Sequence, residues 1–113
     1  QEKSPALENA LELIENGLAD EAEYICEEHL ANQGPRAETF FALGKVYEAQ
    51  KKLDQSEDAF LKCIYLENGN QEAYEKLATL SDITGREKQA EYFREQSTRH
   101  PWIDDRHRPH SSD

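Results

Sequence analysis

Three of the four histidines in the chain gather near its C-terminal end, in the stretch RHPWIDDRHRPHSSD. Imidazole and carboxylate groups are common zinc ligands, and His-rich tracts sometimes bind metal. The candidate ligands are His100, His107, His110, Asp104 and Asp105. Two prolines, high polarity and a terminal position instead favour a flexible segment. We therefore expect residues 105–113 to form a polar, flexible tail, and we assign no metal site.

Motifs that carry catalytic chemistry are missing from the sequence. It contains no Gly-rich phosphate loop, no G-x-S-x-G, no H-E-x-x-H and no C-x-x-C. The many acids fall on helix faces that we expect to be exposed, where they are solvated charges. We therefore expect no catalytic residue, no cofactor and no enzyme activity. Cys26 and Cys63 fall on apolar stripes, which predicts small buried core residues and fits a reducing cytoplasm.

The 113 residues carry a net charge of −11, and the charge is concentrated in the first third of the chain. Such an acidic surface repels phosphate backbones, so we expect no nucleic acid partner. There is no run of 18 apolar residues and no signal-peptide core, so we expect no membrane contact and a cytoplasmic protein. The chain starts at Gln1 rather than Met, and we expect it to be part of a longer protein.

A shift of 34 residues aligns the chain with itself. The aligned sets are Phe40 with Tyr74, Leu43 with Leu77, Gly44 with Ala78, Ala22 with Ser56 and Ala90, and Gly17 with Lys51 and Gly85. Three units follow from this register, residues 3–36, 37–70 and 71–104, and together they form one domain, 3–104. Each unit reads as two helices joined by a short turn, so the predicted fold class is all-α.

Six helices are predicted from apolar periodicity and from helix start and stop signals. Their approximate ranges are 5–16, 19–31, 36–50, 54–66, 71–84 and 87–99. Ser4 is expected to cap the first helix, with Pro5 at its first position. In the last helix, Arg94, Ser97 and Thr98 take the places of Phe60, Cys63 and Ile64, a polar exchange that suits the end of an array.

The second unit resembles the tetratricopeptide repeat (TPR) family. The residues that carry the resemblance are Phe40, Leu43, Gly44, Tyr47, Phe60 and Leu66, with Ser56 where the family usually has Ala. The resemblance implies three tandem helix–turn–helix units in a right-handed superhelical solenoid that serves as a protein-binding scaffold. It also implies that Gly44 lies where the second helix of the unit crosses the first, with Ser56 facing it.

TPR arrays line a concave groove with the first helix of each unit, and the resemblance places a partner-binding site there. The expected groove residues are Leu7, Leu11, Glu15, Phe41, Lys45, Glu48, Lys76, Thr79 and Ile83. Phe41 stands out because Phe40 already fills the core position. The alternative for Leu7 and Leu11 is packing between helices. The mixed lining suits a protein or peptide with apolar anchors and basic residues.

The carboxylate clamp of chaperone-binding TPR proteins is absent, because Leu7, Leu11, Ala42 and Glu72 stand at four of its five positions. More loosely, stretches such as GLADEAEYICEEHL resemble the repeats appended to bacterial chemotaxis-receptor methyltransferases. Three hypotheses therefore remain open. The chain is a partner-binding module, a structural or self-associating module, or the TPR part of an S-adenosylmethionine-dependent methyltransferase.

Overall fold

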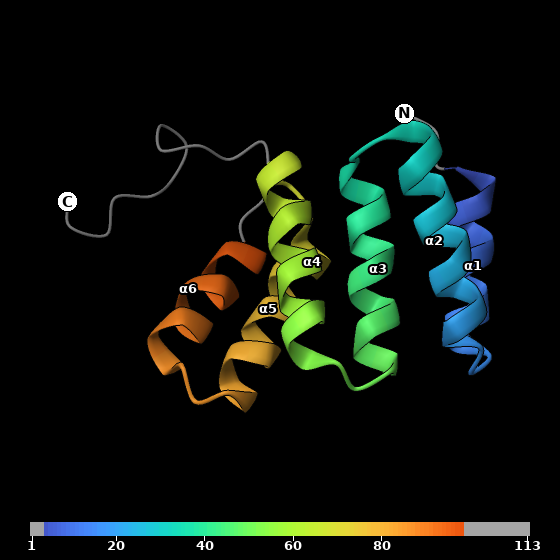
Figure 1. Ribbon diagram of the computed structural model, residues 1–113. Coiled ribbons are helices and arrows are strands. Elements are labelled where there is room, and N and C mark those ends of the chain that lie inside the picture. Colours follow the sequence, from blue (N-terminus) through green and yellow to red (C-terminus); the bar gives the residue numbers. More distant parts are fainter. Residues whose placement is uncertain (1–3, 99–113) are drawn as a thin grey trace.

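The computed structural model of the chain describes residues 4–98, which form six α-helices and contain no strand (Figure 1). The helices are α1 (Pro5–Glu15), α2 (Ala19–Gln33), α3 (Ala37–Ala49), α4 (Leu53–Leu66), α5 (Gln71–Ile83) and α6 (Glu87–Ser97). The all-α prediction is confirmed. The predicted end of the second helix was wrong by two residues, since the helix continues to Gln33 and stops at Gly34, whose φ is +80°.

Each helix packs most closely against its neighbour in a pair, α1 with α2, α3 with α4, and α5 with α6. Figure 1 shows the helices following one another across the molecule in approximately chain order, with α3 between the first pair and α4. The second helix of each pair begins at Ala19, Leu53 and Glu87, which are 34 residues apart. Further contacts join α2 to α3, α4 to α5 and α1 to α3, so consecutive pairs are packed together.

The three turns within the pairs share one backbone geometry. Gly17, Lys51 and Gly85 have φ of +81°, +65° and +79°. In each turn the next residue donates its N–H to a carbonyl five residues back, and the Lys52 N to Tyr47 O distance is 2.8 Å. This is the closure of a Schellman C-cap, which favours glycine in the left-handed position. Lys51 therefore carries a conformational cost that the two glycines avoid.

The helix starts are only partly as expected. Ser4 does precede α1 and Pro5 is its first residue, but the Ser4 side chain makes no capping hydrogen bond. A side-chain cap occurs instead at α5, where Asn70 Oδ1 accepts a hydrogen bond from Ala73 N at 3.0 Å.

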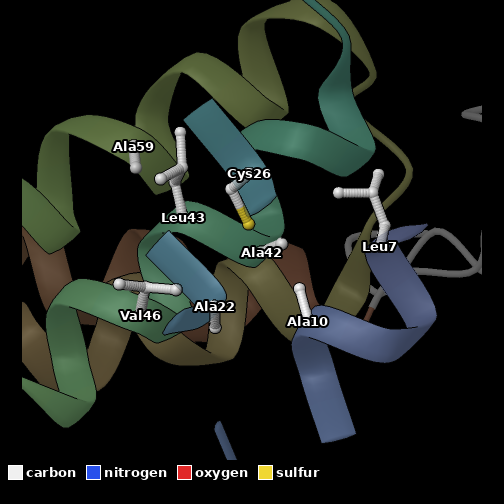
Figure 2. Packing of buried hydrophobic residues seen from close by; sticks show 8 residues of the cluster. All are labelled: Leu7, Ala10, Ala22, Cys26, Ala42, Leu43, Val46 and Ala59. Carbon is white, nitrogen blue, oxygen red and sulfur yellow. The ribbon is translucent and has the colours of Figure 1, made fainter. Parts of the chain in front are cut away.

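The buried apolar residues form two clusters. The first core cluster joins α1, α2, α3 and one residue of α4, and Figure 2 shows its side chains converging from these helices. Its members are Leu7, Ala10, Ala22, Cys26, Ala42, Leu43, Val46 and Ala59. The second core cluster joins α4, α5 and α6 through Phe60, Cys63, Ala73, Tyr74, Leu77, Ala78, Leu80 and Phe93. The predicted burial of Cys26 and Cys63 is confirmed, and both are free thiols.

Gly44 lies inside α3 at a close approach of α4. A β-carbon built on Gly44 would lie 2.6 Å from Cε1 of Phe60, closer than real contacts of this kind. Ser56 of α4 donates a hydrogen bond of 2.8 Å from its Oγ to the Gly44 carbonyl. The predicted crossing is therefore present with Ser56 facing Gly44, and the Phe60 ring is the group that excludes a larger residue.

The polar exchange on α6 is correct at two of three positions. Arg94 and Thr98 are exposed, but Ser97 is only 8% exposed, and its Oγ donates to the Arg94 carbonyl at 2.7 Å. A small hydroxyl that bonds its own helix backbone can be buried without losing a partner. On the same helix Phe93 is buried, whereas Tyr92 is 54% exposed.

Candidate partner-binding groove

A groove of about 740 Å³ opens at the end of the molecule where α1, α3 and α5 begin. Its walls come from the first two turns of α1 and α3, the first turn of α5, the last residue of α4 and the two connections that precede α3 and α5. The lining residues are Leu7, Glu8, Leu11, Pro35, Arg36, Ala37, Glu38, Phe41, Ala42, Leu66, Glu67, Asn70 and Glu72.

The apolar part of the groove combines buried and accessible side chains. Leu7 is 3% exposed and belongs to the first core cluster, so it forms the floor and packs between helices, as in the alternative interpretation. Leu11 and Phe41 are half-buried. The Phe41 ring meets the Phe60 ring edge-on, with 5.7 Å between centroids, which holds it in place while one side stays accessible. Leu66 is 45% exposed.

The charged groups of the groove are mostly acidic. Among the described residues that line it there are four glutamates, Glu8, Glu38, Glu67 and Glu72, against one arginine, Arg36. These carboxylates come from three helices and one connection, so the negative charge surrounds the apolar floor. The groove therefore presents an electrostatic environment that favours a cationic group.

Two ion pairs join α3 to α5 beside the groove. Lys45 Nζ lies 3.4 Å from Glu72 Oε2, and Lys76 Nζ lies 3.1 Å from Glu48 Oε1. Lys45 also lies 5.5 Å from the centroid of the Phe41 ring, a cation–π distance. The structure thus brings together the predicted residues Phe41, Lys45, Glu48 and Lys76, with the two lysines already paired.

Three predicted groove residues lie away from this site. Glu15 is eight residues beyond Leu7 on α1, which corresponds to about 12 Å along a helix. Ile83 is the last residue of α5 and is 59% exposed. Thr79 donates its hydroxyl proton to the carbonyl of Glu75 on its own helix. Glu15 and Ile83 stand at the opposite helix ends, and none of the three lines the groove.

Residues of the connections were missing from the sequence-based set. Pro35, Arg36 and Asn70 precede α3 and α5, Leu66 is the last residue of α4, and Glu67 follows it. The signal that could have found them is the short connection between antiparallel helices, which puts the end of one helix beside the start of the next. The set was carried over from first-helix positions alone.

The titratable groups of the core show no sign of activation. Burial, with nearby glutamates adding to it, raises the pKa of the Cys26 thiol from 9.0 to about 12. Burial likewise raises the pKa of Cys63 to about 11, against the hydrogen bond from Asn70, which lowers it. A nucleophilic cysteine needs a lowered pKa, so these thiols have the character of core residues.

Neither a metal-ligand cluster nor a membrane-spanning helix occurs within residues 4–98. No group of three or more His, Cys, Asp or Glu side chains in this range could hold a metal ion. No helix in the same range is both long and apolar enough to cross a bilayer. The candidate ligands His100, His107 and His110 and the predicted tail lie outside the described residues.

Comparison with known proteins gives one partial relationship. No family model matches the chain. A 73-residue stretch, 65% of this chain, is 34% identical to a Pseudomonas aeruginosa protein described as the probable biofilm formation methyltransferase WspC. The match spans only 17% of that protein's length. The chain is therefore similar to a small part of a methyltransferase-related protein, which agrees with the looser of the two sequence resemblances.

Proposed function

We propose that this chain is a non-catalytic protein-interaction module that binds a partner segment in the groove between α1, α3 and α5. The observation that supports it is the pair of half-buried apolar side chains, Leu11 and Phe41, on a concave surface ringed by charged groups. Such surfaces are used to bind peptide segments with apolar anchors. In this proposal the helix pairs are three TPR units, 3–36, 37–70 and 71–104, in a right-handed superhelical array.

The absence of catalysis is part of the proposal. Lys45 and Lys76, the cations beside the groove, are held in ion pairs, and the two buried thiols have raised pKa values. These groups suit packing and recognition better than proton transfer or nucleophilic attack. We propose a cytoplasmic location on the same grounds, since the two free buried cysteines fit a reducing compartment.

The test is affinity capture with wild-type protein, Phe41→Ala and Lys45→Glu. Tyr24→Ala is the matched control, because Tyr24 is 64% exposed on α2 and does not line the groove. Circular dichroism should show equal helix content in all four proteins. We expect quantitative mass spectrometry to show that specific partners are lost with Phe41→Ala and retained with Tyr24→Ala. Equal recovery of the same partners by every protein would contradict the groove hypothesis.

A second candidate is that the chain is the TPR part of a larger S-adenosylmethionine-dependent methyltransferase, a context suggested by the similarity to WspC. Under this hypothesis the catalytic domain is encoded upstream of the codon for Gln1. Genome sequence at that locus tests it directly. Calorimetric titration of this chain with S-adenosylmethionine should show no binding, because the cofactor site would lie in the other domain.

Self-association is favoured by a different surface. Leu61 and Tyr65 lie one turn apart on α4 and are 39% and 88% exposed. Exposed apolar and aromatic neighbours of this kind can pair two copies of a chain. Sedimentation equilibrium of wild type and Leu61→Glu tests this hypothesis. A dimer that the substitution dissociates would support it, and a monomeric wild type would remove it.

A further inference from the structure

Lys45 makes two contacts by which a protein could hold a cation from a partner. Its ammonium group is 3.4 Å from a carboxylate oxygen of Glu72 and 5.5 Å from the centroid of the Phe41 ring. Glu72 and Phe41 both line the groove. The Lys45 side chain therefore connects the acidic wall of the groove to its apolar floor.

The Lys45 ammonium group can be replaced at Glu72 by a cation from another molecule. The Lys45 and Glu72 side chains are 25% and 53% exposed, and their 3.4 Å separation is longer than that of Lys76 and Glu48. Exposed ion pairs contribute little to stability, so separating this one costs little. If Lys45 turned away, the Glu72 carboxylate and one side of the Phe41 ring would be left to receive another cation.

We propose that Lys45 is an internal substitute for a basic side chain of the partner, which displaces it from Glu72 and Phe41 during binding. The inference rests on the proposed function and adds the chemistry of the ligand. The partner is an arginine-containing peptide segment whose apolar neighbour contacts Leu11. Arginine suits the site better than lysine, because its planar guanidinium bonds a carboxylate with two N–H groups and stacks on an aromatic ring.

The other charged residues of the groove also favour a basic partner. Glu8, Glu38 and Glu67 add three carboxylates around the floor, and Arg36 supplies one positive charge. An acidic segment would meet like charges here, so the same residues that attract a basic partner exclude an acidic one.

Lys62 provides a matched control on another face of the protein. It repeats the chemistry of Lys45, with Asp58 at 3.0 Å and the Phe40 ring centroid at 5.5 Å, but neither of these two partners lines the groove, whereas both partners of Lys45 do. Lys62→Gln and Lys45→Gln change the net charge equally. A difference between them therefore reports the position of the lysine rather than the general acidity of the protein.

The test is fluorescence anisotropy with a labelled peptide in which leucine and arginine alternate. We expect Lys45→Gln to bind it about three- to fivefold more tightly than wild type, which is the size of a released surface ion pair. Glu72→Gln should bind it about three- to fivefold more weakly, and Lys62→Gln should bind like wild type. Unchanged or weaker binding by Lys45→Gln, or equal gains in both lysine variants, overturns the inference.

A second peptide separates this inference from the proposed function. In it, glutamine replaces every arginine. We expect this peptide to bind more weakly to wild type and to be unaffected by Lys45→Gln. If both peptides bind wild type equally and Phe41→Ala weakens both, the groove binds peptides without a basic site, so the inference fails while the function stands. If Phe41→Ala weakens neither, both fail.

Discussion

The crossings of α1 with α2 and of α3 with α4 occupy equivalent places in the sequence but are built from different residues. In the second pair Gly44 has no side chain, and the Phe60 ring fills the space at its α-carbon. In the first pair, 34 residues earlier, Ala10 and Cys26 stand at these positions, both fully buried. A larger residue on one helix thus goes with a smaller one on the other. The changes are opposite in direction, since a methyl group is present at Ala10 where the aromatic ring is absent at Cys26, while neither position keeps its residue type.

The two crossings also differ in what they connect. Cys26 belongs to the first core cluster, together with the residues of α3 around Leu43. Phe60 belongs to the second core cluster, although its helix neighbour Ala59 belongs to the first. The crossing of α3 and α4 is therefore the place where the two clusters meet, and we expect changes there to have larger effects.

The largest effect is expected from Phe60→Ala, which removes a fully buried ring from this junction. Urea unfolding should show a loss of about 3–5 kcal/mol in the free energy of unfolding. The equivalent change in the first pair, Cys26→Ala, removes one sulfur atom and should cost about 1 kcal/mol. Equal losses in the free energy of unfolding for the two variants would show that the two crossings contribute equally to stability.

Gly44→Ala should lower the free energy of unfolding by about 1–3 kcal/mol, since the added β-carbon overlaps the Phe60 ring. In a Phe60→Leu background the same change should cost less, because leucine leaves room for a methyl group. The reciprocal control is Ala10→Gly, which should cost about 2 kcal/mol through lower helix propensity and the loss of a buried methyl group. Strictly additive losses in the double variant would refute volume matching.

High pH should weaken the first crossing through Cys26. Its pKa is raised by burial from 9.0 to about 12, so the folded state keeps the neutral thiol while the unfolded chain loses its proton. The stabilisation is complete below pH 9 and is lost as the pH rises further, by up to about 1.4 kcal/mol per pH unit for each thiol. Unfolding measured between pH 9 and 10 should show a smaller slope for Cys26→Ala, in which Cys63 is the remaining buried thiol.

The smallest effect is expected at the turn of the second pair. Lys51 adopts the left-handed conformation that Gly17 and Gly85 adopt in the other two turns. Lys51→Gly should stabilise the protein by about 0.5–1 kcal/mol, the relief of backbone strain being partly offset by a more flexible unfolded chain. Gly85→Lys is the opposite change and should destabilise it. A loss of stability in Lys51→Gly would mean that the lysine side chain supports the turn.

The features that depend on the period of the chain could be predicted from the sequence. The helix positions follow from apolar spacing, and the close approach at Gly44 follows from what the TPR resemblance of the second unit implies. Glycine at two of the three turns likewise indicated their conformation. These features are local or repeat at a fixed interval, so the pattern in one unit strengthens the prediction of the same helices and turns in the other two.

The features that depend on side-chain geometry between units were not predictable in the same way. The groove lies at one end of the helices, so Arg36 and Leu66 line it and the predicted residues Glu15 and Ile83 do not. The pairing of Lys45 with Glu72 depends on how far α3 and α5 are shifted relative to each other along their axes. No residue spacing within one helix determines these outcomes.

The two ion pairs between α3 and α5 have a further consequence, because their charges alternate. On α3 lysine precedes glutamate, at Lys45 and Glu48, and on α5 glutamate precedes lysine, at Glu72 and Lys76. If α5 slid along α3 by one turn toward its own start, Lys76 would come level with Lys45, and like charges would meet. The alternating pattern therefore favours one register of α5 against α3 over a register shifted by one turn. Salt screens such charges, so this small contribution to the register is largest at low ionic strength.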